Sequence, residues 1–129
     1  MAERLRGAGL EYADGFALNV SNYVGTPENL AYGQALSALT GGAHFVVDTS
    51  RNGNGAPDDH AWCHPEGRAL GNRPTTQTGV ATWDAFLWLK RLSESDGACN
   101  GGPRAGISGR FRRSRWRRAR SGNRVAARA

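Results

Sequence analysis

Three short apolar segments alternate with polar loops along the chain, and each is typical of a buried strand. They cover residues 15–20, 44–47 and 81–89. The third segment lacks the separation of apolar and polar positions at i, i+3 and i+4 that a helix requires, which favours a strand. Residues 2–9 instead predict the last turns of a helix that ends at Gly7 or Gly9.

One longer helix is predicted over residues 28–39, between the first two strand segments. Thr26 is expected to cap its N-terminus, and Pro27 suits the first helical position because it has no N–H to leave unpaired. The positions around its amphipathic cylinder include Leu30, Gln34, Leu36 and Leu39. The helix is expected to stop at Gly41, because glycine readily takes the left-handed conformation that closes helices.

The succession of strand, loop, helix, strand, loop and strand predicts an α/β fold with a parallel sheet. Each strand segment leads into a polar cluster at its carboxyl end. The three clusters are Asn19, Asn22 and Tyr23; Asp48, Arg51 and Asn52; and Lys90, Glu94 and Asp96. Because active sites of parallel α/β proteins gather at this edge of the sheet, the clusters together indicate a functional site.

The chain combines an acidic body with a strongly basic end. Its 129 residues and 39% hydrophobic content suit one globular domain with its own core. Residues 1–103 carry seven basic and all eleven acidic side chains, a formal charge of −4, whereas residues 104–129 carry ten arginines and no acid. No window has the roughly 18 apolar residues of a membrane span. The charged N-terminus is unlike a secretory signal, so neither a membrane partner nor a signal peptide is expected.

The basic segment 107–129 admits two interpretations. An arginine-rich arm with Phe111 and Trp116 between its charges could bind nucleic acid through phosphate neutralisation and base stacking. Alternatively, the abrupt change to Arg, Ser, Gly and Ala is typical of a frameshift in a GC-rich coding sequence. We favour the second interpretation, and therefore expect no nucleic-acid partner. In either case the segment has too few apolar residues to fold alone, which predicts disorder or a loose helix.

The cysteines and histidines do not form a metal-binding pattern. Cys63 and Cys99 lack the spacing of zinc ligands, and the three histidines add no HxxxH arrangement, so no metal is expected. Spacing alone leaves the two cysteines either as free thiols or as one disulfide. A disulfide here would stabilise the fold by roughly 3–4 kcal/mol and would suit an oxidising compartment.

Two further features could carry chemistry. Glu94 and Asp96 lie two residues apart and close to Lys90, and paired carboxylates beside a cation can be tuned for acid–base catalysis. The same three side chains could equally form a solvated salt-bridge loop. Trp62 lies in a loop rich in glycine and proline, where it could either fill the core or stack on a ligand. The residues themselves leave both pairs of interpretations open.

Five segments of the chain form a distinctive ordered set. They are GFALNVSNY (15–23), FVVDTSRNGNG (45–55), WCHPEGRALG (62–71), TGVATWDAFLWLK (78–90) and ESDGACNGGP (94–103). In order and spacing they resemble the C-terminal part of the catalytic domain of glycoside hydrolase family 6, the secreted cellulose-degrading endoglucanases and cellobiohydrolases. The resemblance covers residues 1–106. It implies the C-terminal portion of an incomplete, distorted (β/α) barrel, with residues 107–129 as a separate tail.

The resemblance also implies an activity. Enzymes of this family are glucanases that hydrolyse β-1,4-glucosidic bonds in cellulose or related β-glucans with inversion of configuration. Inversion requires a carboxylic acid on one side of the bond and a base for water on the other, roughly 6.5–9.5 Å apart. The family further implies a secreted, monomeric protein that needs no cofactor. It does not distinguish endo-acting from exo-acting enzymes.

The resemblance assigns roles to individual residues. Asp96, in ESDG, matches the aspartate taken as the catalytic base. The positions that match substrate-binding residues are Asn22, Trp62, Lys90 and Glu94. Among these, Trp62 matches a tryptophan on which a glucosyl ring stacks. Cys63 and Cys99 match a disulfide-bonded pair, which would tether the Trp62 loop to the Asp96 loop.

Departures from the family pattern lower the activity expected of this chain. The aspartate-cysteine-alanine-alanine motif that holds the family's general acid is absent, and with it the N-terminal half of the barrel. Residues 91–93 replace the usual proline-glycine turn before Glu94, and the basic tail replaces an aromatic-rich helix. General acid catalysis contributes roughly 10²–10⁴-fold, so little or no turnover is expected. The alternative is a non-enzymatic protein that binds glucan through Trp62 or nucleic acid through the tail.

Overall fold

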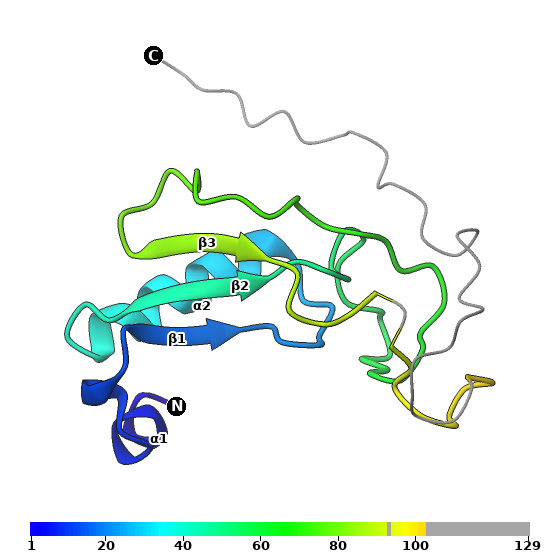
Figure 1. The fold of residues 1–129 in the computed structure, drawn as a ribbon. Coiled ribbons are helices and arrows are strands. Elements are labelled where there is room, and N and C mark those ends of the chain that lie inside the picture. Colours follow the sequence, from blue (N-terminus) through cyan, green and yellow to red (C-terminus); the bar gives the residue numbers. More distant parts are fainter. Residues whose placement is uncertain (93, 103–129) are drawn as a thin grey trace.

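The computed structural model describes residues 1–92 and 94–102. Its elements are α1 (Ala2–Gly7), the 3₁₀ turn η1 (Leu10–Tyr12), β1 (Gly15–Leu18), α2 (Thr26–Leu39), β2 (His44–Asp48) and β3 (Trp83–Leu87) (Figure 1). All three predicted strands and both predicted helices are present. None of the described helices is long and apolar enough to cross a membrane. The expectations for the tail 107–129 fall outside the described residues.

The three strands form one parallel sheet in the order β1-β2-β3. The chain passes from β1 to β2 through α2, and from β2 to β3 through the loops and turns of residues 49–82. Figure 1 shows the three strands pointing the same way, with their following loops gathered at one end. The predicted parallel α/β sheet is thus confirmed. The described residues show an open sheet and do not show a barrel.

One aromatic side chain from each strand contributes to a row across the sheet. Phe16 stacks on Phe45 with 5.6 Å between ring centroids, and Phe45 stacks on Trp83 at 5.8 Å. Phe86 meets Trp83 edge-on at 4.4 Å. The parallel register makes Phe45 the neighbour of both Phe16 and Trp83, so the pairing of the strands and the packing of the rings support each other.

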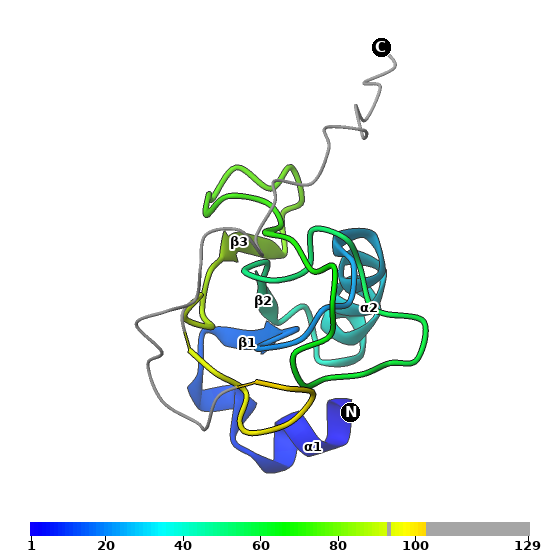
Figure 2. The ribbon, with the colours of Figure 1, turned by 90° about the vertical axis from the view of Figure 1, so that its right-hand side faces the viewer.

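Helix α2 covers one face of this sheet (Figure 2). Its buried residues are Asn29, Gly33, Leu36 and Ser37. Their spacing of i, i+4, i+7 and i+8 forms one stripe along the helix. Leu39 lies off this stripe and is exposed, so it does not belong to the buried face of the helix. Gly33 permits a close approach to the sheet, because a Cβ atom there would lie 2.4 Å from the Phe45 ring.

The N-terminus of α2 differs from the prediction. The helix includes Thr26, Gly25 precedes it, and no side chain caps it. The Thr26 hydroxyl instead donates to Asn72 Oδ1 at 3.3 Å and accepts from Asn52 Nδ2 at 3.3 Å. The prediction that Thr26 caps the helix is therefore wrong, because its hydroxyl ties α2 to the loops that follow β2.

The contact between α2 and β2 predicts a marked effect of a single methyl group. Gly33→Ala should lower the free energy of unfolding by about 1–3 kcal/mol, because the new methyl group overlaps the buried Phe45 ring. Gly7→Ala is the matched control: its Cβ would meet open space at the end of α1, so stability should stay within about 1 kcal/mol or rise. Urea unfolding followed by tryptophan fluorescence measures both, and equal stabilities would contradict the packing described.

Candidate functional site

A buried carboxylate at the end of β2 holds the loops after all three strands. Asp48 Oδ2 accepts the N–H of Ser21 at 3.0 Å and that of Lys90 at 3.1 Å. Its Oδ1 accepts the N–H of Ser50 at 2.9 Å and that of Leu89 at 3.3 Å. The residue is 1% exposed. Because the donors follow β1, β2 and β3, one side chain fixes the relative positions of three loops.

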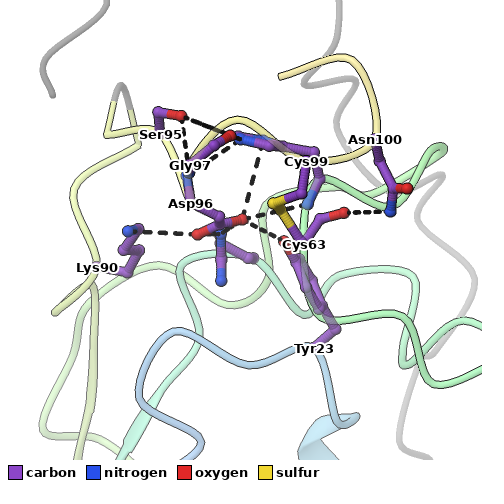
Figure 3. Close-up of a disulfide and its surroundings, with 10 residues drawn as sticks. Tyr23, Cys63, Lys90, Ser95, Asp96, Gly97, Cys99 and Asn100 are labelled. Atoms are coloured by element: carbon purple, nitrogen blue, oxygen red, sulfur yellow. Dashed lines mark hydrogen bonds and ion pairs between the residues drawn. A yellow bond between two sulfur atoms is a disulfide. The ribbon is translucent and has the colours of Figure 1, made fainter. Parts of the chain in front are cut away.

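Asp96 lies at the centre of the polar cluster that these loops form (Figure 3). Arg51 Nη1 donates to both Asp96 carboxylate oxygens at 2.7 Å, and Lys90 Nζ lies 3.4 Å from Oδ1. The Tyr23 hydroxyl donates to Asp96 Oδ2 at 3.3 Å. The Asp96 side chain is only 6% exposed. Each of the three strand-end clusters therefore contributes a side chain to one constellation.

The surrounding charges set the protonation states of this constellation. Burial alone would raise the pKa of Asp96, but the hydrogen bonds and charge of Arg51, the backbone N–H of His64 and the charge of Lys90 together hold it below its ordinary value. The pKa of Tyr23 is raised to about 12, chiefly by burial and further by Asp96, although the charge of Arg51 opposes the shift. Asp96 is therefore an anion near neutral pH, and Tyr23 is a neutral donor.

Lys90 joins the two acidic residues of the predicted pair. Its Nζ lies 3.5 Å from Glu94 Oε2 as well as 3.4 Å from Asp96 Oδ1. The side chain of Lys90 is 12% exposed and that of Asp96 only 6%. The interpretation as a solvated salt-bridge loop is therefore wrong for these two residues, whereas Glu94 reaches further into solvent.

A disulfide between Cys63 and Cys99 connects the Trp62 loop to the Asp96 loop (Figure 3). Asn100 Nδ2 adds a hydrogen bond to the carbonyl of Cys63 at 2.8 Å. The free-thiol alternative is thus wrong. Trp62, next to Cys63, is 68% exposed, so the interpretation that it fills the core is also wrong.

Asn22 lies at the same end of the sheet, in the loop after β1. Its Oδ1 accepts the N–H of Tyr23 at 2.8 Å, and its own N–H donates to the carbonyl of Asn19 at 2.8 Å. The loop is fastened to the end of β2 because Asn19 Nδ2 donates to the carbonyl of Asp48 at 2.9 Å. The sequence-predicted residues Asn22, Trp62, Lys90, Glu94 and Asp96 all lie on loops of this one edge.

Several residues that build the site were not among the predicted site residues. Arg51, Tyr23 and Asp48 do occur in the strand-end clusters, and their position after apolar segments is the signal that could have identified them. His64 has no such signal beyond its place after Cys63. Within residues 1–92 and 94–102, no three His, Cys, Asp or Glu side chains are arranged to hold a metal ion.

Comparison with known proteins gives the family. The chain belongs to the glycosyl hydrolases family 6, whose family model matches residues 1–114. Endoglucanase A of Cellulomonas fimi is 57% identical over 103 residues, which are 80% of this chain and 22% of that protein. A probable 1,4-beta-D-glucan cellobiohydrolase C of Aspergillus fumigatus is 48% identical over 61 residues, 45% of this chain and 13% of that protein.

A solved structure agrees with the sequence comparisons. The endoglucanase Cel6 from Mycobacterium tuberculosis, in complex with methyl-cellobiosyl-4-deoxy-4-thio-beta-D-cellobioside, superposes with a TM-score of 0.77 at 55% sequence identity. The match covers 81% of this chain and 37% of that chain. This chain therefore spans little more than a third of the Cel6 structure and about a fifth of the Cellulomonas fimi protein.

The ion pairs of Asp96 predict a specific sensitivity to acid. Its pKa in the fold lies below that of an unfolded aspartate, about 3.9, so the carboxylate stabilises the fold fully above that pH. This contribution is lost as the pH falls through the folded-state pKa. The difference in free energy of unfolding between the natural chain and Asp96→Asn should therefore be largest near about pH 6 and shrink below about pH 4.

Denaturant unfolding at several pH values measures this difference. Asp58→Asn is the matched control, because Asp58 is an exposed aspartate and its substitution should leave the free energy of unfolding within about 0.5 kcal/mol of the natural chain at about pH 6. A difference for Asp96→Asn that stays constant down to about pH 2.5 would contradict the role of its ion pairs.

Proposed function

We propose that this chain is the sugar-binding, base-bearing part of a β-1,4-glucanase that hydrolyses glucosidic bonds in cellulose or related β-glucans with inversion. The observation that carries the proposal is the convergence of Asp96, Lys90 and the loop of the exposed Trp62 at one edge of the sheet. The family membership supports it, since relatives of the chain are named endoglucanases and cellobiohydrolases.

In this proposal Asp96 is the proton acceptor for the attacking water. Arg51 and Lys90 keep its carboxylate ionised, which is the protonation state that a base requires. The same cations lower its basicity, and a base with a depressed pKa accepts a proton with less driving force. The charges around Asp96 therefore limit the rate that this residue can support by itself.

The proposed sugar contacts surround this carboxylate. The exposed indole of Trp62 offers a flat apolar surface on which one face of a glucosyl ring can stack. Lys90 and Glu94, which lie within 3.5 Å of each other, present a donor and an acceptor for sugar hydroxyls. Asn22 supplies a further polar side chain from the loop after β1. We propose that the chain binds glucan as a monomer outside the cell, where its disulfide is stable.

Inversion needs a second carboxyl group, as a general acid, on the other side of the scissile bond. Glu94 forms an ion pair with Lys90, as Asp96 does, but Glu94 is proposed to bind sugar and not to act as this acid. The chain alone is therefore predicted to release no measurable reducing sugar from a soluble β-glucan. Release by the purified chain that is abolished in Asp96→Ala would contradict this prediction and would assign catalysis to the described residues.

Binding of glucan should survive the absence of turnover. We predict that the chain is retarded in native gels containing soluble β-glucan, and that Trp62→Ala weakens binding by about tenfold through loss of the stacking surface. Tyr12→Ala is the matched control, because Tyr12 is an even more exposed aromatic residue before β1, at the other end of the sheet. Equal retardation of both variants would exclude Trp62 as the sugar platform.

A glucan-binding protein without catalytic activity is the second candidate. The exposure of Trp62 favours it, because stacking on a sugar needs no catalytic acid. The two candidates differ in one measurement. Hydrolysis that appears when a complementary fragment of a family 6 catalytic domain is added would favour the glucanase, whereas retained binding without hydrolysis would favour the binding protein.

A further inference from the structure

The imidazole of His64 is enclosed against the loop that carries Asp96. Its side chain is 7% exposed. A Cβ atom on Gly102 would lie 2.0 Å from the ring carbon Cδ2, so the Gly102 backbone packs closely against the imidazole. The backbone N–H of His64 donates to Asp96 Oδ2 at 3.3 Å. Since the ring and its backbone both contact this loop, the imidazole has little freedom to turn away from it.

One ring nitrogen of His64 faces both a donor and an acceptor. Nε2 lies 3.1 Å from the backbone N–H of Asp96 and 3.1 Å from the carbonyl of Gly97. The Ser95 hydroxyl, also at 3.1 Å, can adapt to either state of the nitrogen because it both donates and accepts. An unprotonated Nε2 can accept from the Asp96 N–H, whereas a protonated Nε2 can no longer do so and can instead donate to Gly97 O or Ser95 Oγ.

We propose that His64 positions Asp96 through this choice of partner, and that protonation of the imidazole weakens the glucan site. The inference rests on the proposed glucan-binding function. In the neutral ring, Nε2 accepts the Asp96 N–H, and Nδ1 carries the proton 3.9 Å from Asp96 Oδ2. When a proton from solvent binds Nε2, the Asp96 N–H loses its acceptor. Residues 95–97 then have to shift, and the carboxylate moves relative to Arg51 and Lys90.

The surroundings of His64 make its charge matter. Asp96 faces the ring directly, and Asp96 is in turn contacted by Arg51, Lys90 and Tyr23 from the loops after β2, β3 and β1. An imidazolium would bring a third cation to one carboxylate that already binds two. Histidine is the side chain that ordinarily changes charge between about pH 5 and 8.

Nuclear magnetic resonance of the full chain tests the positioning role without any sugar. Two-bond proton–nitrogen correlation spectra of the natural chain should show His64 with its proton on Nδ1 at about pH 7.5. The amide resonance of Asp96 should then shift with the same midpoint as the His64 ring as the pH is lowered. A proton on Nε2 at neutral pH, or an Asp96 amide that does not follow the ring, overturns the proposal.

Two variants separate positioning from a merely structural role. His64→Asn removes the titration, and asparagine tolerates the positive φ of 44° at this position, so its Asp96 amide should not shift between about pH 7.5 and 5. His60→Asn is the matched control: His60 is exposed on the same loop and also has a positive φ, of 54°, so the natural titration should persist. Persistence of the shift in His64→Asn would overturn the proposal.

Retardation by soluble β-glucan gives the functional readout. From about pH 7.5 to 5 the natural chain should lose about fivefold in affinity, the effect of one net hydrogen bond, while His64→Asn should stay constant. Equal pH dependence in both chains overturns the link between His64 and the site. If the resonances behave as expected but no chain is retarded at either pH, the positioning of Asp96 by His64 stands and the proposed glucan function fails.

Discussion

The carboxylate of Asp48 is the constraint on which the candidate site depends. Parallel strands deliver their loops to one edge of a sheet, but they do not fix the conformation of those loops. Asp48 does so by accepting four backbone N–H groups from the segments after β1, β2 and β3. A buried carboxylate is costly unless hydrogen-bonded, and buried N–H groups are costly without acceptors. The carboxylate and the four N–H groups therefore depend on each other, and this mutual dependence holds the loops in one arrangement.

Two carboxylates at this edge have different partners and different parts to play. Asp48 is bound by backbone groups and organises the loops, whereas Asp96 is bound by the side chains of Arg51 and Lys90 and is the residue proposed as the base. The disulfide between Cys63 and Cys99 brings the Trp62 loop to the same place. The loop of Trp62, the proposed sugar platform, and the ionised carboxylate of Asp96 therefore lie together because the backbone that carries them is held in place.

Local patterns predicted the elements because their causes are local. Short apolar segments ending in polar clusters located β1, β2 and β3, and the helix between the first two indicated that those strands run parallel. The predicted cap of α2 failed because Asn72, 46 residues away, binds the Thr26 hydroxyl. The pairing of Arg51 with Asp96 spans 45 residues, across an irregular segment with no periodicity, so no local pattern encodes it. The residue roles came from family resemblance and remain proposals.

Native-state hydrogen exchange on the Asp48→Asn variant tests this account most directly. In the natural chain the amides of Ser21, Ser50, Leu89 and Lys90 should be protected. The variant should lose protection in all three loops together, while amides between β1 and β2 stay protected. Loss confined to Ser50, the nearest donor, would contradict the claim that one carboxylate holds the three loops in place.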